Sequence, residues 1–308
     1  MYEQKYQELN KKKKTKNIGT IILIVVLALI IGASEYVYTN IELINRIENP
    51  TLLVAITIVF YVILFIAIEV KMIEPYRMYK ANTLAEIKYD ILGRKLSNAF
   101  GSDYRIENPL DFCGELEDID FARQFPISND YLVLKYNNIR FKYIDCDIFE
   151  SSDDGIRRFF KGEVFVFKFR ESISEDLYIG TKEKFILGDI SELENLITNP
   201  SIKTINPSNS ILKENIELKS TNYFNLIDNI EFQETINKLF ESGIKFLIYR
   251  NNKIYVFRDN KELLFNIKID KSSKEQEAEI LFEQDIEKLK QHLNEILQYK
   301  KSLHIEEL

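Results

Sequence analysis

Residues 131–145, YLVLKYNNIRFKYID, decide the predicted fold of this 308-residue chain. Apolar and polar side chains alternate over residues 131–136 and again over 139–145, as in strands that place one face on a core. Asn137 and Asn138 lie between the two runs, and asparagine tolerates the positive φ angles of a tight turn. The stretch therefore predicts a β-hairpin.

The sequence beyond this hairpin predicts further strands and helices of an α+β domain with an antiparallel sheet. Predicted strands cover residues 164–169, 177–187 and 216–219, and a three-stranded meander covers residues 244–249, 253–257 and 263–269. Predicted helices cover residues 192–197 and 231–241, and a long helix runs to about Tyr299 from a capping box formed by Ser273 and Gln276. The apolar stripe of that helix, which includes Ile286, Leu289 and Leu293, predicts packing on a sheet.

Two charge-free apolar runs, residues 18–34 and 52–68, precede this domain. Each run approaches the length of about 20 residues that a helix needs to cross a bilayer, so together they predict a transmembrane hairpin over residues 18–72. Five lysines cluster over residues 11–16, just before the first run, and an acidic loop separates the two runs, which predicts cytoplasmic termini. The alternative is that the first run is a cleaved signal peptide.

The predicted organisation has four parts. A basic juxtamembrane segment covers residues 1–17, the hairpin follows over 18–72, and a connecting helix with a kink at Pro75 covers 73–101. A cytoplasmic α+β domain occupies residues 102–308. The stretch 199–210, rich in asparagine, proline and serine, either divides that domain or crosses it as one long loop.

The charge distribution argues against nucleic-acid binding. The net charge is −7, and the first sixteen residues carry +4, which leaves −11 for the rest of the chain. Nucleic-acid binding depends on clustered positive charge that meets phosphates, so no nucleic-acid partner is expected.

Cysteine and histidine are too few and too scattered for the usual metal and nucleophile motifs. Cys113 and Cys146 form no CxxC pair, and His292 and His304 lie far from both cysteines in the sequence. No zinc site, no metal and no cofactor are therefore expected, and nothing in the sequence supports a Cys-His nucleophile pair.

Two groups of carboxylates are candidates, the first for a hard cation and the second for acid–base or two-metal chemistry. The first is expected to be a solvated face, and the second is not expected to act because it lacks histidines or other partners. The basic residues near the second group either balance its charge or meet lipid headgroups. Gly155 and Gly162 are isolated and form no phosphate loop. The first group comprises Glu115, Glu117, Asp118 and Asp120, the second Asp145, Asp147, Asp153 and Asp154, and the basic residues are Arg157, Arg158 and Lys161.

The segments YNNIRFKYIDCDIF (136–149), FFKGEVFVFKF (159–169) and FNLIDNIEFQETINKLFESGIKFLIYRNNKIYVF (224–257), together with the N-terminal hairpin, resemble the bacterial membrane family catalogued as domain of unknown function 3137. The resemblance implies a bacterial inner-membrane protein with a cytoplasmic α+β domain. It implies no catalytic residues.

The expected function is that of a membrane-anchored interaction or regulatory module in the bacterial cell membrane, without evident catalysis. Two alternatives belong to other classes: a membrane-bound hydrolase that uses carboxylates, and an oligomeric two-span channel or sensor. The expected partners are the lipid bilayer, an unidentified protein and, in the channel alternative, further copies of the chain.

Overall fold

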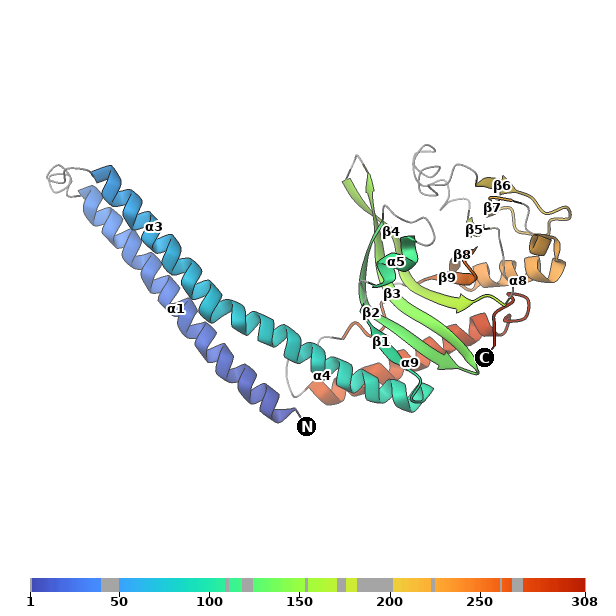
Figure 1. Cartoon of the computed structure of the whole chain (residues 1–308), viewed down its shortest axis with the longest axis horizontal. Coiled ribbons are helices and arrows are strands. Elements are labelled where there is room, and N and C mark those ends of the chain that lie inside the picture. The colour runs from blue at the N-terminus through green and yellow to red at the C-terminus, as the bar shows by residue number, and fades with distance from the viewer. Residues whose placement is uncertain are drawn as a thin grey trace. The chain divides into compact units, whose positions relative to one another are not determined.

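The computed structural model describes residues 2–39, 50–108, 111–117, 124–152, 155–170, 176–181, 202–222, 225–260, 262–267 and 274–307. The chain divides into two compact units, each described here by itself (Figure 1). The first unit comprises Met1–Asp90 with Ile269–Glu277, and the second comprises Ile91–Lys268 with Ala278–Leu308.

Helices α1 (Glu3–Thr39) and α3 (Pro50–Ile68) form most of the first unit. Tyr2, Tyr6 and Leu9, near the start of α1, are buried. Close contact continues further along α1, where a Cβ built on Gly19 would lie 3.0 Å from the Cβ of Met72. The absence of a Cβ at Gly19 thus lets the two helical segments approach each other.

In the described parts of the chain, no helix is both long and apolar enough to cross a membrane. The predicted transmembrane hairpin over residues 18–72 is therefore wrong, as are the multi-pass topology and the cell-membrane location derived from it. The first run is only the middle of α1, which also contains the lysine-rich segment before it, and it packs on the returning helix at Gly19.

Large apolar side chains remain exposed on both helices, among them Ile24 and Leu27 on α1 and Phe60 and Ile63 on α3. Homo-oligomerisation, which the sequence raised as one alternative, stays a prediction.

A π-helical turn, η1 (Glu69–Ile73), joins α3 to α4 (Glu74–Phe100) where the sequence predicted a kink at Pro75. Proline has no backbone N–H and cannot donate the bond that would continue an α-helix. The N–H of Glu74, one residue earlier, bonds to the carbonyl of Glu69, the wider spacing of a π-helix. The irregularity therefore lies in the turn before Pro75, and the helix continues to Phe100 as predicted.

The second unit is built on an antiparallel sheet, which agrees with the predicted α+β class. In the described residues nine strands are joined in the order β1-β2-β3-β4-β9-β8-β5-β7-β6. Their bounds are β1 (Arg105–Glu107), β2 (Gln124–Tyr136), β3 (Ile139–Ser152), β4 (Gly155–Lys168), β5 (Leu177–Thr181), β6 (Lys203–Ile205), β7 (Ile216–Ser220), β8 (Ile244–Arg250) and β9 (Lys253–Asp259).

Two Asn-Asn turns fix the register of the hairpins β2–β3 and β8–β9. Asn137 and Asn138 have φ angles of 48° and 62°, and Asn251 and Asn252 have φ angles of 51° and 57°. Positive φ at both central residues matches the twist of the flanking strands. The hairpin predicted from residues 131–145 is confirmed, and so are the predicted strands at 164–169, 216–219, 244–249 and 253–257.

The predicted third strand of the meander, residues 263–269, is wrong where the structure describes it. The second edge of β9 already pairs with β4, so no edge remains for that segment. Residues 262–267 instead form turns, in which Phe265 has a φ of 58° and packs against Tyr143 and Phe282. Residues 192–197 and Ser273 lie outside the described residues, and of the strand predicted over 177–187 the structure describes β5.

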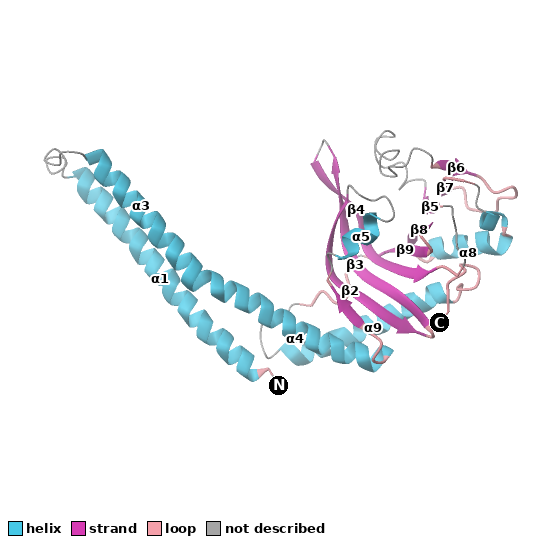
Figure 2. Ribbon diagram, viewed as in Figure 1, coloured by secondary structure: helices cyan, strands magenta, loops and turns pink. Residues whose placement is uncertain are grey.

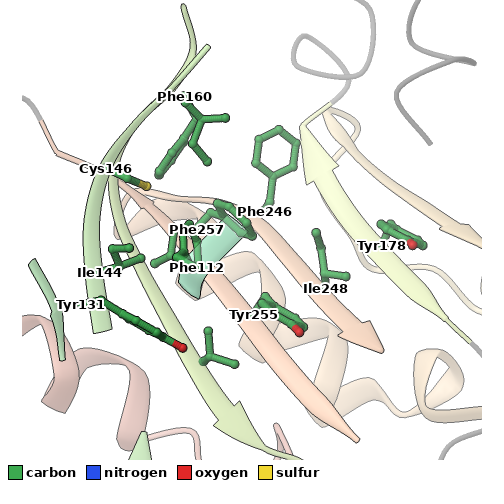
Figure 3. Packing of buried hydrophobic residues seen from close by; sticks show 13 residues of the cluster. Phe112, Tyr131, Ile144, Cys146, Phe160, Tyr178, Phe246, Ile248, Tyr255 and Phe257 are labelled. Atoms are coloured by element: carbon green, nitrogen blue, oxygen red, sulfur yellow. The ribbon is translucent and has the colours of Figure 1, made fainter. Parts of the chain in front are cut away.

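Helices lie on both faces of the sheet (Figure 2). On the α9 face, α9 (Glu275–Leu297) packs through the predicted stripe, including Ile286, Leu289 and Leu293, and α8 (Ile230–Glu241) packs Phe232 against Tyr249. On the opposite α5 face, the short helix α5 (Asp111–Glu117) places Phe112 against Tyr131. Figure 3 shows the apolar side chains gathered on the α5 face, including Ile144, Phe246 and Phe257.

Gly162 of β4 sits where the backbone of β9 approaches most closely. A Cβ at this position would lie 2.0 Å from the carbonyl oxygen of Arg258. We expect Gly162→Ala to lower the free energy of unfolding by at least about 2 kcal/mol, because two paired strands would have to separate. Gly114→Ala in α5 is the control, since a Cβ there meets nothing within 4 Å. Equal thermal unfolding of the two variants would contradict the packing.

Candidate functional site

Five basic side chains form a row across five adjacent strands of the α5 face. Lys135 pairs with Arg140 across the β2–β3 hairpin, Lys168 pairs with Lys253 between β4 and β9, and Lys253 pairs with Arg250 across the β8–β9 hairpin. Arg140 and Lys168 each stand one residue beyond the pair Phe141–Phe167, which joins the two halves. We call these five residues the basic row.

The basic row lies at the end of the sheet where both Asn-Asn turns are found. Neighbouring strands are roughly 4.8 Å apart, so five strands place the row over roughly 20 Å. Arg140 and Lys168 are exposed, and Lys135, Arg250 and Lys253 are half-buried. The row is therefore a continuous cationic strip that solvent reaches.

Carboxylates of the same chain balance one part of the row. Lys168 lies 2.7 Å from Glu306, and the Nε of Arg250 lies 3.5 Å from Asp176. By contrast, no ion pair joins Lys135 or Arg140 to another residue that the structure describes. The positive charge is thus least compensated at the β2–β3 end.

Next to the row, the carboxylate of Glu115 on α5 is held by four groups from three strands. The Nζ of Lys142 and the hydroxyl of Tyr131, 3.3 Å away, donate to Oε1. The Nζ of Lys253, 2.7 Å away, and the hydroxyl of Tyr255, 3.3 Å away, donate to Oε2. We call Lys142, Lys253, Tyr131 and Tyr255 the cage, and both cage tyrosines are labelled in Figure 3.

The electrostatics of the cage favour a charged carboxylate. Burial alone would raise the pKa of Glu115, but the hydrogen bonds from Lys142 and Lys253 outweigh it and hold the pKa below the ordinary value of 4.5. Burial and the negative charge of Glu115 raise the pKa of Tyr131, so its hydroxyl stays protonated and remains a donor. The cage is therefore built to bind an anion.

A second polar cluster lies on the α9 face and joins the sheet to α9. Glu163 of β4 is fully buried, lies 2.7 Å from Nδ1 of His292, and accepts a hydrogen bond of 3.2 Å from the hydroxyl of Tyr143. Arg258, the partner of Glu163 on β9, forms an ion pair with Glu295 of α9. These contacts fix the helix on the sheet and lie away from the basic row.

The acidic group predicted around Glu115 is not a solvated face at that residue. Glu115 is only 8% exposed and points into the cage. The side chain of Glu117 and the residues Asp118 and Asp120 lie outside what the structure describes. Among the described residues, no group of three or more acidic, histidine or cysteine side chains is placed to hold a metal ion.

Asp145 and Asp147 of the second carboxylate group lie in different surroundings. Asp145 is fully buried on the α9 face beside Glu163, whereas Asp147 forms an ion pair of 2.8 Å with Arg158. Arg158 thus balances Asp147, one of the two roles weighed for the basic cluster. Asp153, Asp154 and the side chain of Arg157 lie outside the described residues, while Lys161 is half-buried on β4.

The cysteines and histidines are not brought together. Cys146 is buried on the α5 face, where burial and the neighbouring Asp145 and Asp147 raise the pKa of its thiol. His292 lies on the other face of the sheet with Glu163, so the sheet separates the two side chains. Cys113 is half-buried on α5, and His304 lies against the ring of Phe169.

Sequence reasoning missed the basic row and the cage. A local signal was present, because basic residues flank both Asn-Asn turns, in KYNNIR (135–140) and RNNK (250–253). What the sequence did not contain was the pairing of β4 with β9, which brings the two turns to one end of one sheet.

Comparisons with known proteins give no relative for this chain. No family model matches it, and no curated protein matches it. Among solved structures, the crystal structure of the mycobacterial trehalose monomycolate transport factor A, TtfA, has a TM-score of 0.33 and 9% identity, over 63% of this chain and 94% of that one. A likeness this weak carries no argument, and the resemblance to domain of unknown function 3137 stays a prediction.

We expect Glu115→Gln to lower the free energy of unfolding by about 2 kcal/mol at pH 7, because two lysines lose their buried counter-charge. The folded-state pKa of Glu115 is depressed, so its stabilisation is complete above the ordinary value of 4.5 and is lost as the pH falls through the folded value. The difference between wild type and variant should therefore shrink below pH 4.5 in urea unfolding curves.

Glu214→Gln is the matched control, since it removes the same charge from an exposed side chain. It should change the free energy of unfolding by less than about 0.5 kcal/mol at every pH. A Glu115→Gln difference that stays constant down to pH 3 would contradict the assigned charge of Glu115.

Proposed function

We propose that this protein is an interaction module that binds an acidic segment of a partner protein along the basic row. The proposal rests on one observation, the continuous alignment of Lys135, Arg140, Lys168, Lys253 and Arg250 across five strands. Like charges side by side on neighbouring strands repel one another. Lys135 and Arg140 pair across the β2–β3 hairpin and form no ion pair with the described residues, so this end of the row favours an acidic ligand.

An extended acidic segment matches the dimensions of the row. An extended chain advances about 3.3 Å per residue, so six or seven residues cover roughly 20 Å. Glutamate and aspartate side chains of such a segment can reach successive cations, and arginine can hold a carboxylate through two parallel hydrogen bonds. Lys135 and Arg140 would supply most of the uncompensated charge.

A nucleic acid is the less favoured polyanion. The chain as a whole carries a net charge of −7, so a long polyphosphate would be repelled everywhere except at this strip. A short acidic peptide segment can engage the strip alone. The proposal concerns recognition and assigns no catalytic step to the residues of the site.

The test uses a fluorescein-labelled peptide of ten glutamates, titrated with the full-length protein and followed by fluorescence anisotropy. The charge reversal Lys135→Glu/Arg140→Glu should weaken binding at least tenfold, because it places two negative charges in the strip. Binding by the wild type should also weaken as salt is raised, because exposed charges are screened.

Lys203→Glu/Lys238→Glu is the control, since it changes the net charge equally with two exposed side chains on β6 and α8, away from the row. It should leave the affinity within about twofold of wild type. Equal loss in both double variants, or no binding of the peptide by wild type, would contradict the proposal.

A further inference from the structure

The cage and the basic row share a residue. Lys253 belongs to the row through its pairing with Lys168 and Arg250, and its Nζ also donates to Glu115. Lys142 lies on the same strand and the same face as Arg140, two residues further in. The cage is thus the inner end of the same cationic surface.

The four groups of the cage all come from the sheet, whereas the anion comes from a separate element. Tyr131, Lys142, Lys253 and Tyr255 lie on β2, β3 and β9, which are held by backbone pairing. Glu115 is carried by α5, a helix of seven residues, which the buried ring of Phe112 also anchors against Tyr131. The backbone that carries the four binding groups is therefore held by strand pairing and does not depend on Glu115.

We propose that the cage is a carboxylate-binding pocket, that Glu115 occupies it in the unbound protein, and that an acidic side chain of the bound segment takes its place. This inference rests on the proposed function and identifies Glu115 as the residue that competes with the partner for the cage. Replacement of one carboxylate by another keeps one negative charge beside Lys142 and Lys253, so the net charge of the cage is the same before and after the exchange.

The chemistry of the cage specifies the ligand. Two ammonium groups and two phenol hydroxyls donate hydrogen bonds to the position that the carboxylate of Glu115 occupies. A ligand at this position must therefore be a hydrogen-bond acceptor with negative charge. The resident group is a side-chain carboxylate, and a glutamate or aspartate of a partner reproduces its charge and its two oxygens.

Competition by Glu115 has a measurable consequence. The chain's own carboxylate fills the cage in most molecules, so a ligand can bind only to the fraction in which the cage is open. The apparent affinity is the affinity of the open cage multiplied by that fraction. Removing the resident charge should therefore tighten binding of the same ligand. This is opposite to the usual effect of substituting a residue at a binding site.

The experiment titrates the labelled ten-glutamate peptide with wild type, Glu115→Gln and the control Glu214→Gln. Glu115→Gln should bind at least fivefold more tightly than wild type, and Glu214→Gln should bind within twofold of it. Adding Lys142→Met to Glu115→Gln should remove the gain, because the cage then lacks one of its two cations while the basic row keeps all five. Circular dichroism confirms that each variant is folded.

Glu115→Asp keeps the test decisive if Glu115→Gln fails to fold. Its carboxylate is shorter by one methylene and fits the cage less well, so its affinity for the peptide should lie between those of wild type and Glu115→Gln. An affinity of Glu115→Asp equal to or below that of wild type would overturn the inference.

Failure of the inference can be told apart from failure of the proposed function. If wild type binds the peptide and Lys135→Glu/Arg140→Glu weakens it, while Glu115→Gln binds no better than Glu214→Gln, the basic row is a binding surface and the cage is not. If none of the proteins binds the peptide, both proposals fall. Tighter binding of a ten-nucleotide oligothymidylate than of the peptide by Glu115→Gln would overturn the carboxylate assignment.

Discussion

The ion pairs of Glu115 with Lys142 and Lys253 are the interaction on which the α5 face depends. A carboxylate that is 8% exposed is costly to bury unless opposite charges and hydrogen bonds compensate it, and here two lysines and two tyrosines do so. The same contacts hold α5 on the sheet and join it to β2, β3 and β9. Glu115 supplies a single negative charge to a cluster that holds two lysines.

The two faces of the sheet use their polar groups differently. On the α9 face, Glu163, His292 and Tyr143 form a buried set in which every named contact joins the sheet to its helix or to a neighbouring strand. On the α5 face, the polar set opens into a row of cations that reaches solvent. This difference separates the face that holds the unit together from the face that we propose meets a partner.

Local patterns predicted the local parts of this fold well. Alternation around Asn137 and Asn138 predicted the β2–β3 hairpin, and the apolar stripe that contains Leu289 predicted α9 on the sheet. Residues 263–269 failed as a strand because β4 takes the edge of β9. The transmembrane hairpin is wrong because no described helix is both long and apolar enough to cross a membrane. The candidate site required that same β4–β9 pairing, which no local pattern contains, and hence only Glu115 was singled out beforehand.

Hydrogen exchange of α5 tests the central claim most directly, because the claim is that a bound acidic segment displaces Glu115. Amides of residues 111–117 should exchange faster when the ten-glutamate peptide saturates the wild-type protein, while the amides of β3 and β9 around Lys142 and Lys253 exchange no faster than before. Exchange in residues 111–117 that is unchanged or slower with bound peptide would contradict displacement and would place the peptide beside an intact Glu115 cage.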